Sequence, residues 1–426
     1  MLKEIKYNFK SQPVIAAVTV VGTALSILLV MVVVMAQEIK VAPFAPESGR
    51  DRFLHYQYII YGNSSWGDIE EVNSANSMSI GTVRRLFYPL ETPEAVSAYA
   101  YMTSTKSVGL KGEKPLSVDV REIDDRFFKV FDFTFVDGKP FSNADFEAEL
   151  PVAVIDSDVA RRLFGTEQAT GREFNLNGTP YRVSGVVRPV SPLATFAYGQ
   201  VWPNLTSTPA GHSENNLLGG NFSVTMLAPD TENGMAEVRA EFNRRLDEYQ
   251  KEISEGGWAI INRNRPYTQA KAVAEVSANV EPDEKILFWR RLLIYSILLL
   301  VPAINLSSMT QSRLRRRVSE IAIRRAFGQT RASAAVNLVA ENMVITLIGG
   351  IMGLLMAVVV AFCFADSLFA PSLVRQHTAA VVEPSMLLQW DVFGLALLFC
   401  FILNLLSSAL PAWRMSRVPL VESLKS

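Results

Sequence analysis

Four apolar stretches without a charged residue interrupt the chain, and each is long enough to form a helix that crosses a membrane. They cover residues 13–36, 292–312, 343–365 and 392–413. A helix needs about 20 residues to span the ~30 Å hydrocarbon core of a bilayer. We therefore expect an α-helical membrane protein with four transmembrane helices. The first stretch is too long for the apolar core of a signal peptide, so we expect it to remain as a span.

The segment between the first two spans, residues 37–285, shows the short mixed patterns of a folded α+β domain. The apolar run 152–155 predicts a buried strand. Ser157 stands where the N-cap of a following helix is expected, and Gly165 stands where that helix ends.

Two further patterns strengthen the expectation of mixed α and β structure in this domain. Apolar and polar residues alternate on both sides of Asn177-Gly178, which predicts a β-hairpin over 172–187. Apolar residues three and four positions apart from Val238 to Ile253 predict an amphipathic helix that ends at Gly256-Gly257. The stretch 186–220, rich in Pro, Gly, Ser and Asn, predicts a long loop or a junction between subdomains.

Lysine and arginine residues beside the spans give the expected orientation. The tail 1–12 has three lysines and the loop 313–342 has seven arginines, whereas the loop 366–391 has only Arg375. The tail after residue 413 is basic as well. We expect both termini and the loop 313–342 in the cytoplasm, and the large domain on the periplasmic side of a bacterial inner (plasma) membrane.

Charge composition adds little about partners. The formal net charge of −1 combines two compartments, and the outer segment 37–291 alone has 27 basic and 35 acidic residues, a net charge of −8. An acidic, solvated surface is the ordinary surface of a soluble domain. We assign it no specific partner and expect no nucleic-acid binding.

Residue types that bind metals or form disulfides are scarce. Both cysteines, Cys363 and Cys400, lie in apolar runs, and the three histidines are far apart in the sequence with no HExxH motif. The outer domain therefore has no predicted disulfide and no cluster of zinc-type ligands. We expect no metal site.

Motifs for catalysis are missing from the sequence as well. There is no GxSxG or SxxK motif, and no GxxxxGK[ST] loop that would bind nucleotide phosphates. Acidic pairs occur at Asp124-Asp125 and at Asp156 and Asp158, where helix capping is a better explanation than acid–base catalysis. We expect no catalytic residue, no cofactor and no ATPase activity in this chain, and we interpret the outer domain as a binding or force-receiving module.

A short amphipathic segment follows the second span on the cytoplasmic side. One interpretation is a helix that lies on the membrane with its arginines at lipid phosphates, and the other is a helix that docks on a protein. Physical chemistry alone favours the lipid interpretation. The residues concerned are Glu320, Ile321, Ile323, Arg324, Arg325, Ala326, Phe327 and Gly328.

The third span contains Gly349, Gly350 and Gly353, of which the first and last form a GxxxG motif. Glycines at this spacing let another helix approach closely. Packing within one chain and contact between two chains both remain open.

Three sequence blocks resemble the MacB/FtsX-like family of ABC transporter permeases. "RRRVSEIAIRRAFGQTRASAAVNLVAENMVITLIGGIMGLLMA" and "LPAWRMSRVPLVESLKS" are similar to the FtsX-like permease module. "FKVFDFTFVDGKPFSNADF", with the sequence that follows it from Leu150, is similar to the MacB-type periplasmic core domain. Residues 50–115 and 190–285 match less clearly. Departures at Ser319, Ala322 and Phe327 leave the helical pattern intact.

The resemblance implies a domain organisation. Residues 1–12 would be a cytoplasmic tail, 37–285 the MacB-like core domain and 286–426 the FtsX-like permease domain, which ends in a cytoplasmic tail. The segment 317–330 would be a coupling helix that docks on a separate cytoplasmic ABC ATPase subunit. That subunit would bind the ATP, since the fused ATP-binding domain of some family members does not occur in this sequence.

The resemblance also implies a function. The permease would act as a homodimer or with a paralogous permease, and ATP hydrolysis would move the periplasmic domains, a mechanism called mechanotransmission. Its work would be export of a peptide, lipoprotein or small molecule, with a periplasmic adaptor and an outer-membrane channel as further partners of an efflux system. The alternative is a signal transmitter without transport, which regulates a periplasmic hydrolase or senses peptides.

Overall fold

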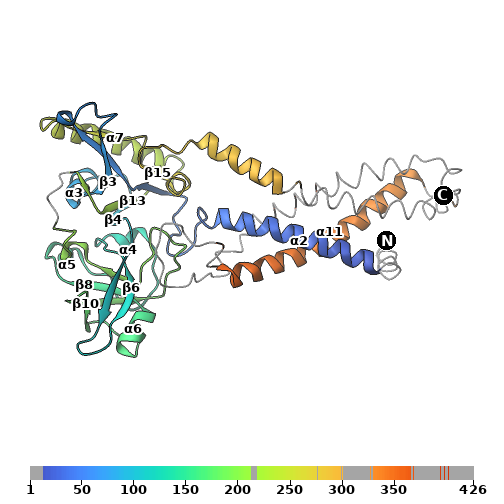
Figure 1. The fold of residues 1–426 in the computed structure, drawn as a ribbon, viewed down its shortest axis with the longest axis horizontal. Helices are drawn as coiled ribbons and strands as arrows, with labels where there is room; N and C mark the ends of the chain where they lie inside the picture. Colours follow the sequence, from blue (N-terminus) through green and yellow to red (C-terminus); the bar gives the residue numbers. More distant parts are fainter. Residues whose placement is uncertain are drawn as a thin grey trace. The chain divides into compact units, whose positions relative to one another are not determined.

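The computed structural model describes residues 13–212, 218–275, 277–298 and 330–365, and the isolated positions 300, 327, 368, 394, 398 and 402. These residues form two compact units, and each is described by itself. The helical unit contains the residues before Ile39 and those from Lys285 to Leu368. The outer domain, Ile39–Glu284, contains all strands of the described chain (Figure 1).

The helical unit is built on α2 (Pro13–Glu38) and α11 (Arg331–Cys363), and residues 284–298 are helical as well. Within the described ranges, Val20–Glu38 is the one helical stretch long and apolar enough to cross a membrane, and Leu347–Cys363 is apolar but shorter. The predicted second span is described only in its first part, and most of the predicted fourth span lies outside the described residues. The number of four spans stays a prediction.

Apolar side chains of these helices are exposed on the surface of the unit. Leu25 on α2 and Leu355 and Val359 on α11 are examples. A water-soluble helix would bury such a face, whereas a helix in hydrocarbon has no reason to do so. The distribution is that expected of helices surrounded by lipid.

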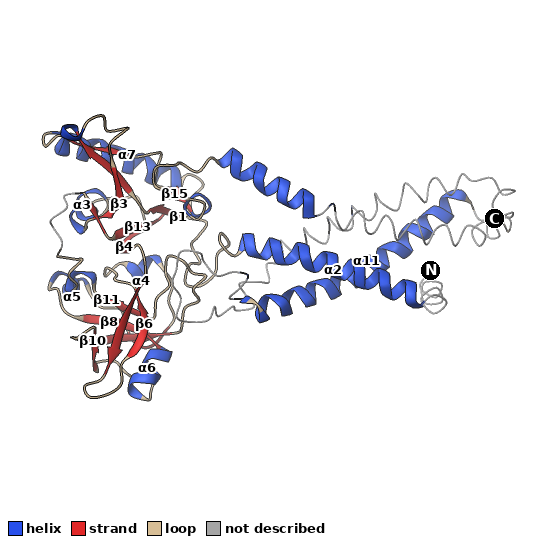
Figure 2. Cartoon of the chain, in the orientation of Figure 1, coloured by secondary structure: helices blue, strands red, loops and turns tan. Residues whose placement is uncertain are grey.

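The outer domain has two sheets, shown in red in Figure 2. The first has the strand order β14-β2-β3-β13-β1-β15, with β12 paired to β3 and β4 paired to β13. Its strands are β1 (Phe53–Tyr56), β2 (Ile59–Asn63), β3 (Ser74–Met78), β4 (Ala95–Ala100), β12 (Gly219–Gly220), β13 (Phe222–Leu227), β14 (Trp258–Ile261) and β15 (Tyr267–Thr268).

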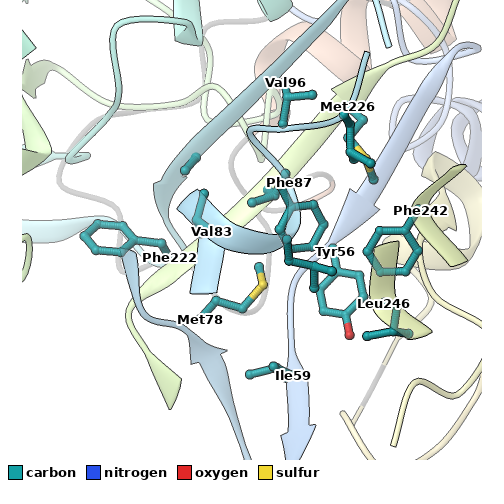
Figure 3. Close-up of a cluster of buried hydrophobic side chains, with 14 of the residues drawn as sticks. Tyr56, Ile59, Met78, Val83, Phe87, Val96, Phe222, Met226, Phe242 and Leu246 are labelled. Atoms are coloured by element: carbon teal, nitrogen blue, oxygen red, sulfur yellow. The ribbon is translucent and has the colours of Figure 1, made fainter. Parts of the chain in front are cut away.

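Helices α3 (Ile80–Leu86) and α7 (Gly234–Ser254) bury their apolar faces in the core of this sheet. The rings of Tyr56, Phe87 and Phe242 meet there with centroids 5.2 to 5.4 Å apart (Figure 3). Aromatic rings at these separations add attraction beyond the burial of their surface. The core therefore fixes α7 to strand β1, the strand nearest in sequence to α2.

The second sheet has the order β7-β10-β8-β11-β6-β5-β9, and β9 also pairs with β10. Six strands thus form a closed ring, which removes the free edges that invite unwanted strand pairing. The strands are β5 (Ser104–Gly109), β6 (Leu116–Val120), β7 (Phe135–Gly138), β8 (Val152–Asp156), β9 (Glu173–Leu176), β10 (Thr179–Val187) and β11 (Val201–Pro203). The short helices α4 (Phe127–Val130), α5 (Asn143–Glu147) and α6 (Ser157–Phe164) connect them, with the 3₁₀ turns η1 (Ser64–Trp66) and η2 (Leu205–Ser207) elsewhere.

Residues 120–124 join the two sheets. On one side, the Arg121 amide donates to the Val201 carbonyl of the second sheet at 3.0 Å. On the other side, the Asp124 amide donates to the Ala98 carbonyl of β4, in the first sheet, at 3.0 Å. The outer domain is therefore one hydrogen-bonded body.

Several local predictions from the sequence are confirmed. Strand β8 covers the predicted apolar run, and β9 and β10 form the predicted hairpin, with Asn177 and Gly178 at φ of 51° and 90° in the turn. Helix α7 covers the predicted amphipathic pattern and ends just before the two glycines.

Two local predictions need correction. The N-cap of α6 is Asp156, whose carboxylate accepts from the Val159 amide at 2.6 Å, and Ser157 is the first helical residue. The carboxylate is the better acceptor at a positive helix terminus, so it displaces the hydroxyl one position later. The stretch 186–220, predicted as a long loop or a junction between subdomains, also contains the short strands β11 and β12, which its composition concealed.

Candidate functional site

The candidate site consists of two linkers of the outer domain that lead to the membrane helices. The N-terminal linker, residues 39–50, directly follows α2. The C-terminal linker, residues 262–284, leads into the helix over 284–298. Both linkers are covalent connections between the helical unit and the outer domain. Their contacts therefore determine how firmly each connection is held on the outer domain.

A fully buried arginine organises the N-terminal linker. The Nε of Arg50 donates to Glu47 Oε2 at 2.7 Å, and both side chains have no exposed surface. Its Nη1 donates to the carbonyls of Ile39 and Ala42, at 2.8 and 3.0 Å, and its Nη2 donates to the carbonyl of Leu193 at 2.9 Å. The guanidinium thus connects both ends of the linker by hydrogen bonds to the loop that precedes β11.

Glu47 completes the arrangement from the other side. Its Oε1 accepts from the backbone amides of Phe196 and Ala197 at 2.7 and 2.8 Å. A buried charge is tolerated only when it is paired and its hydrogen-bonding capacity is used. Both charged groups of this pair meet that condition, so the N-terminal linker is held in one conformation.

The C-terminal linker contains a second buried pair, in which Arg265 Nε and Glu275 Oε2 have no hydrogen-bond partner among the described residues. Nη2 of Arg265 donates to Glu275 Oε1 and to the carbonyl of Ala278, and at most 1% of either charged side chain is exposed. The side chain of Asn262 donates back to the carbonyl of Arg265 at 2.7 Å. Burial raises the pKa of Glu275, and the neighbouring guanidinium opposes that shift. Each linker therefore contains a buried arginine–carboxylate pair, and the pair in the N-terminal linker is the more completely hydrogen-bonded.

A chain of hydrogen bonds connects the two linkers through the first sheet. The amide group of Gln269 donates from Nε2 to the Lys40 carbonyl at 2.9 Å and accepts through Oε1 from Nε2 of His55 at 2.7 Å. With that tautomer, Nδ1 of His55 accepts from Thr225 Oγ1 at 2.9 Å, and Tyr99 donates to Thr225 at 2.7 Å. The network runs from strand β4 to the residue two positions after the end of α2.

His55 stays neutral in this network. Its ring stacks on Phe196 with centroids 4.0 Å apart, and burial lowers its pKa from 6.5 to about 3. The hydrogen bond that His55 donates to Gln269 partly opposes the shift, and the charge of Arg50 adds to it. The imidazole therefore serves as a fixed polar connector.

The glycines of the third predicted span face α2 of the same chain. A Cβ atom on Gly349 would lie 2.8 Å from Cβ of Thr23, and one on Gly353 would lie 2.6 Å from the carbonyl oxygen of Ala24. Any side chain at these positions would force the helices apart. Gly350 is buried beside them.

The contact continues along α11 at intervals of four residues, with Ala357 and Ala361 fully buried. Gly349 lies against Thr23, and Gly353 lies against Ile27, so residue numbers increase in the same direction along both helices. Helices α2 and α11 therefore run parallel and pack closely through small residues.

The predicted coupling segment lies almost entirely outside the described residues. This applies to Glu320, Ile321, Ile323, Arg324, Arg325, Ala326 and Gly328. Phe327 is described, and its side chain is 89% exposed. Thr330 caps α11 by accepting from the Ser333 amide at 3.2 Å, so α11 begins directly after the segment.

These features define a class: a membrane protein with a large extracytoplasmic α/β domain. Two family models match the sequence, the MacB-like periplasmic core domain over residues 15–245 and the FtsX-like permease C-terminal domain over residues 292–420. The first alone covers more than half of the chain. The chain belongs to the ABC transporter permeases of the MacB/FtsX-like family.

Two curated relatives share 22% and 23% sequence identity with this chain. An uncharacterized ABC transporter permease YknZ from Bacillus subtilis is 22% identical over 78% of this chain and 76% of its own length. The macrolide export ATP-binding/permease protein MacB from Chromobacterium violaceum is 23% identical over 86% of this chain. This chain spans about half of that relative, 51% of its length.

Solved structures of extracytoplasmic regions match only weakly. The extracellular domain of the ABC-type transporter YknZ matches 48% of this chain and all of that chain, at 14% identity and a TM-score of 0.33. The periplasmic region of MacB from Actinobacillus actinomycetemcomitans matches 53% of this chain and 96% of that chain, at 15% identity and a TM-score of 0.34.

The first prediction concerns the helix pair. Replacement of Gly353 by leucine should destabilise the solubilised protein by about 1–3 kcal/mol, because the new side chain overlaps α2. Val359→Leu is the matched control, since Val359 faces outward on the same helix. Denaturant unfolding of the whole chain measures the stability of both variants. Equal stability of the two would contradict the described contact.

The second prediction concerns the Arg50–Glu47 pair. Glu47→Gln leaves a buried guanidinium without its counter-charge and should cost about 3–5 kcal/mol of local stability. The control is Glu94→Gln, which breaks the exposed Arg52–Glu94 pair and should cost about 0.2–1 kcal/mol. Hydrogen exchange of peptides covering 39–50 and 191–200 reads out the difference, and similar protection in both variants would refute a role for the buried pair.

The third prediction is a pH dependence. Because the pKa of His55 is lower in the folded protein than in the unfolded chain, its neutral form stabilises the fold above pH 6.5. That stability is lost as the pH falls from 6.5 toward 3, by about 1.4 kcal/mol per pH unit. Between pH 6.5 and 5, hydrogen exchange should thus show that protection of the β1 amides falls more steeply in the wild type than in His55→Gln. His212→Gln, at an exposed position, should show the same pH dependence of protection as the wild type. The same pH dependence in His55→Gln would contradict the prediction.

Proposed function

We propose that this chain is the permease subunit of an ABC system that transmits motion from a separate cytoplasmic ATPase to its own outer domain. The observation that carries the proposal is the pair of buried arginine–carboxylate contacts that fix both linkers. ATP is bound and hydrolysed by the partner subunit. The permease itself catalyses no reaction and works as a homodimer or with a paralogous permease.

Fixed linkers are what such a mechanism requires. A flexible linker would absorb a displacement of the helices, whereas a linker held at several points transfers it to the domain. Breaking one buried pair costs about 3–5 kcal/mol, so the open state is populated only at about one part in 10² to 10⁴. The joined sheets then carry the displacement through the whole outer domain.

The route through the membrane follows from the helix pair. The coupling segment 317–330 leads directly into α11, α11 packs closely on α2, and α2 leads directly into the N-terminal linker. The parallel direction of the two helices supports the proposed orientation, in which both begin at the cytoplasmic face. A push on the coupling segment therefore reaches residue 39 without passing through a loop.

At the cytoplasmic end, the coupling segment docks on the ATPase. Arg324 and Arg325 pair with acidic groups of that subunit, and Ile321, Ile323 and Phe327 provide apolar contact. The high exposure of Phe327 in the isolated chain supports this assignment, because a ring in water is available to a partner.

The motion serves export of a peptide, a lipoprotein or a small molecule, with a periplasmic adaptor and an outer-membrane channel as further partners. The names of the MacB relatives, which specify macrolide export by those proteins, support transport. The alternative is signal transmission to a periplasmic hydrolase. Purified complex in liposomes separates the two, since only an exporter moves a candidate substrate when ATP is hydrolysed.

The fourth prediction tests the coupling segment. Replacing Glu320, Arg324 and Arg325 with alanine together should release the ATPase from solubilised complex, because each desolvated charged contact contributes about 1–3 kcal/mol. The permease should stay folded and inserted. Co-purification with the ATPase at wild-type stoichiometry would favour a helix that only lies on lipid, and Arg84→Ala, on the outer domain, is the control for a general loss of charge.

A further inference from the structure

The helix over residues 284–298, yellow to orange in Figure 1, carries an unusual mixture of side chains. Large apolar residues are exposed along it, and Ile286 and Trp289 are 65% and 64% exposed. The rings of Phe288 and Trp289 lie edge to face with centroids 5.9 Å apart. Arg290 and Arg291 follow at once, and the apolar sequence of the predicted second span begins directly after them.

The two arginines interrupt an apolar surface. Arg290 is exposed and Arg291 is half-buried, and neither forms an ion pair within the part of the chain that the structure describes. Glu38 and Arg291 both interact electrostatically with Tyr295, one turn along the helix.

Their place in the proposed orientation is unexpected. Arginine beside a span favours the cytoplasmic side, yet this pair lies at the outer end of the second span. An outward arginine pair in an apolar surface needs a source of negative charge at the membrane boundary. Lipid phosphate provides it at that depth, and a guanidinium binds phosphate with two parallel hydrogen bonds.

We propose that Trp289, Arg290 and Arg291 form a binding site for the phosphate of anionic phospholipid in the outer leaflet of the membrane. Tryptophan prefers the level of the headgroups, where its ring is buried and its N–H stays in a polar layer. Neighbouring residues on a helix point about 100° apart, so the two guanidinium groups lie on adjacent faces of the helix and widen the positive surface offered to one headgroup. The apolar residues on both sides of the pair along the helix make lipid a better occupant than a soluble acidic protein.

In the proposed mechanism, this binding site would hold one end of the C-terminal linker in place. The C-terminal linker enters the membrane through this helix, so a helix anchored to headgroups holds that linker while α2 and α11 move. This extension rests on the proposed function and orientation. The binding site itself depends only on the orientation.

The experiment uses the full chain, delipidated in detergent and titrated with phosphatidylglycerol or with phosphatidylcholine, with lipid binding counted by native mass spectrometry. Each of Arg290→Gln and Arg291→Gln should weaken phosphatidylglycerol binding about five-fold, and the double variant about 25-fold, with little effect on phosphatidylcholine. Arg84→Gln with Arg85→Gln is the matched control, because it removes another adjacent, exposed pair on the outer domain. It should leave the lipid preference unchanged.

Two results would overturn the proposal. One is an unchanged preference for phosphatidylglycerol in the double variant. The other is displacement of the lipid by millimolar inorganic phosphate, which would show a simple anion site without lipid specificity. Arg290→Cys separates these outcomes from a failure of the proposed function: labelling by an impermeant reagent only from the cytoplasmic side would overturn the orientation, whereas labelling from outside leaves it intact.

Discussion

Arg50 is a permanent positive charge with no exposed surface, and the geometry of the N-terminal linker follows from that fact. A buried guanidinium must find acceptors for its N–H groups, and here the acceptors are Glu47 and the carbonyls of Ile39, Ala42 and Leu193. The first of these carbonyls belongs to the residue that directly follows α2. The need to solvate one charge therefore fixes the place where the chain leaves its helix.

The helical unit obeys a different constraint. Hydrocarbon offers no hydrophobic driving force between helices, so α2 and α11 associate by close packing, for which Gly349 and Gly353 leave room. The contact between small residues is close, and its strength does not depend on the exclusion of water. In the proposed mechanism, a displacement applied at Thr330 moves both helices together. The buried Arg50–Glu47 pair then holds the chain where it enters the outer domain.

Sequence patterns predicted the parts of this organisation that depend on local rules. The first apolar stretch, the turn at Asn177-Gly178 and the amphipathic spacing of α7 have a long apolar run, strong turn residues or a clear period. The N-cap at Asp156 was missed by one position because two capping residues are adjacent. The closed ring of strands could not be predicted, since it depends on pairing between β5 and β9, which lie far apart in the sequence.

The linker contacts were missed for a related reason. Arg50, Glu47 and His55 are ordinary polar residues in the sequence, and no spacing marks them as buried. Their partners at 193–197 and Gln269 are more than 140 residues away. The GxxxG motif was visible, but the helix that it contacts is specified only by three-dimensional packing. The coupling segment depends on the family resemblance and on experiment.

The most direct test of the central claim is a distance measurement across the assembled complex. Spin labels at Glu232→Cys, an exposed position on each of two outer domains, report their separation with and without a non-hydrolysable nucleotide, after Cys363 and Cys400 are replaced by serine. If the fixed linker transmits the motion, nucleotide should shift the distance distribution in the parent protein and in Arg52→Gln. In Arg50→Gln the ATPase should stay bound while the shift is lost or strongly broadened. An undiminished shift in Arg50→Gln would contradict transmission through the fixed linker.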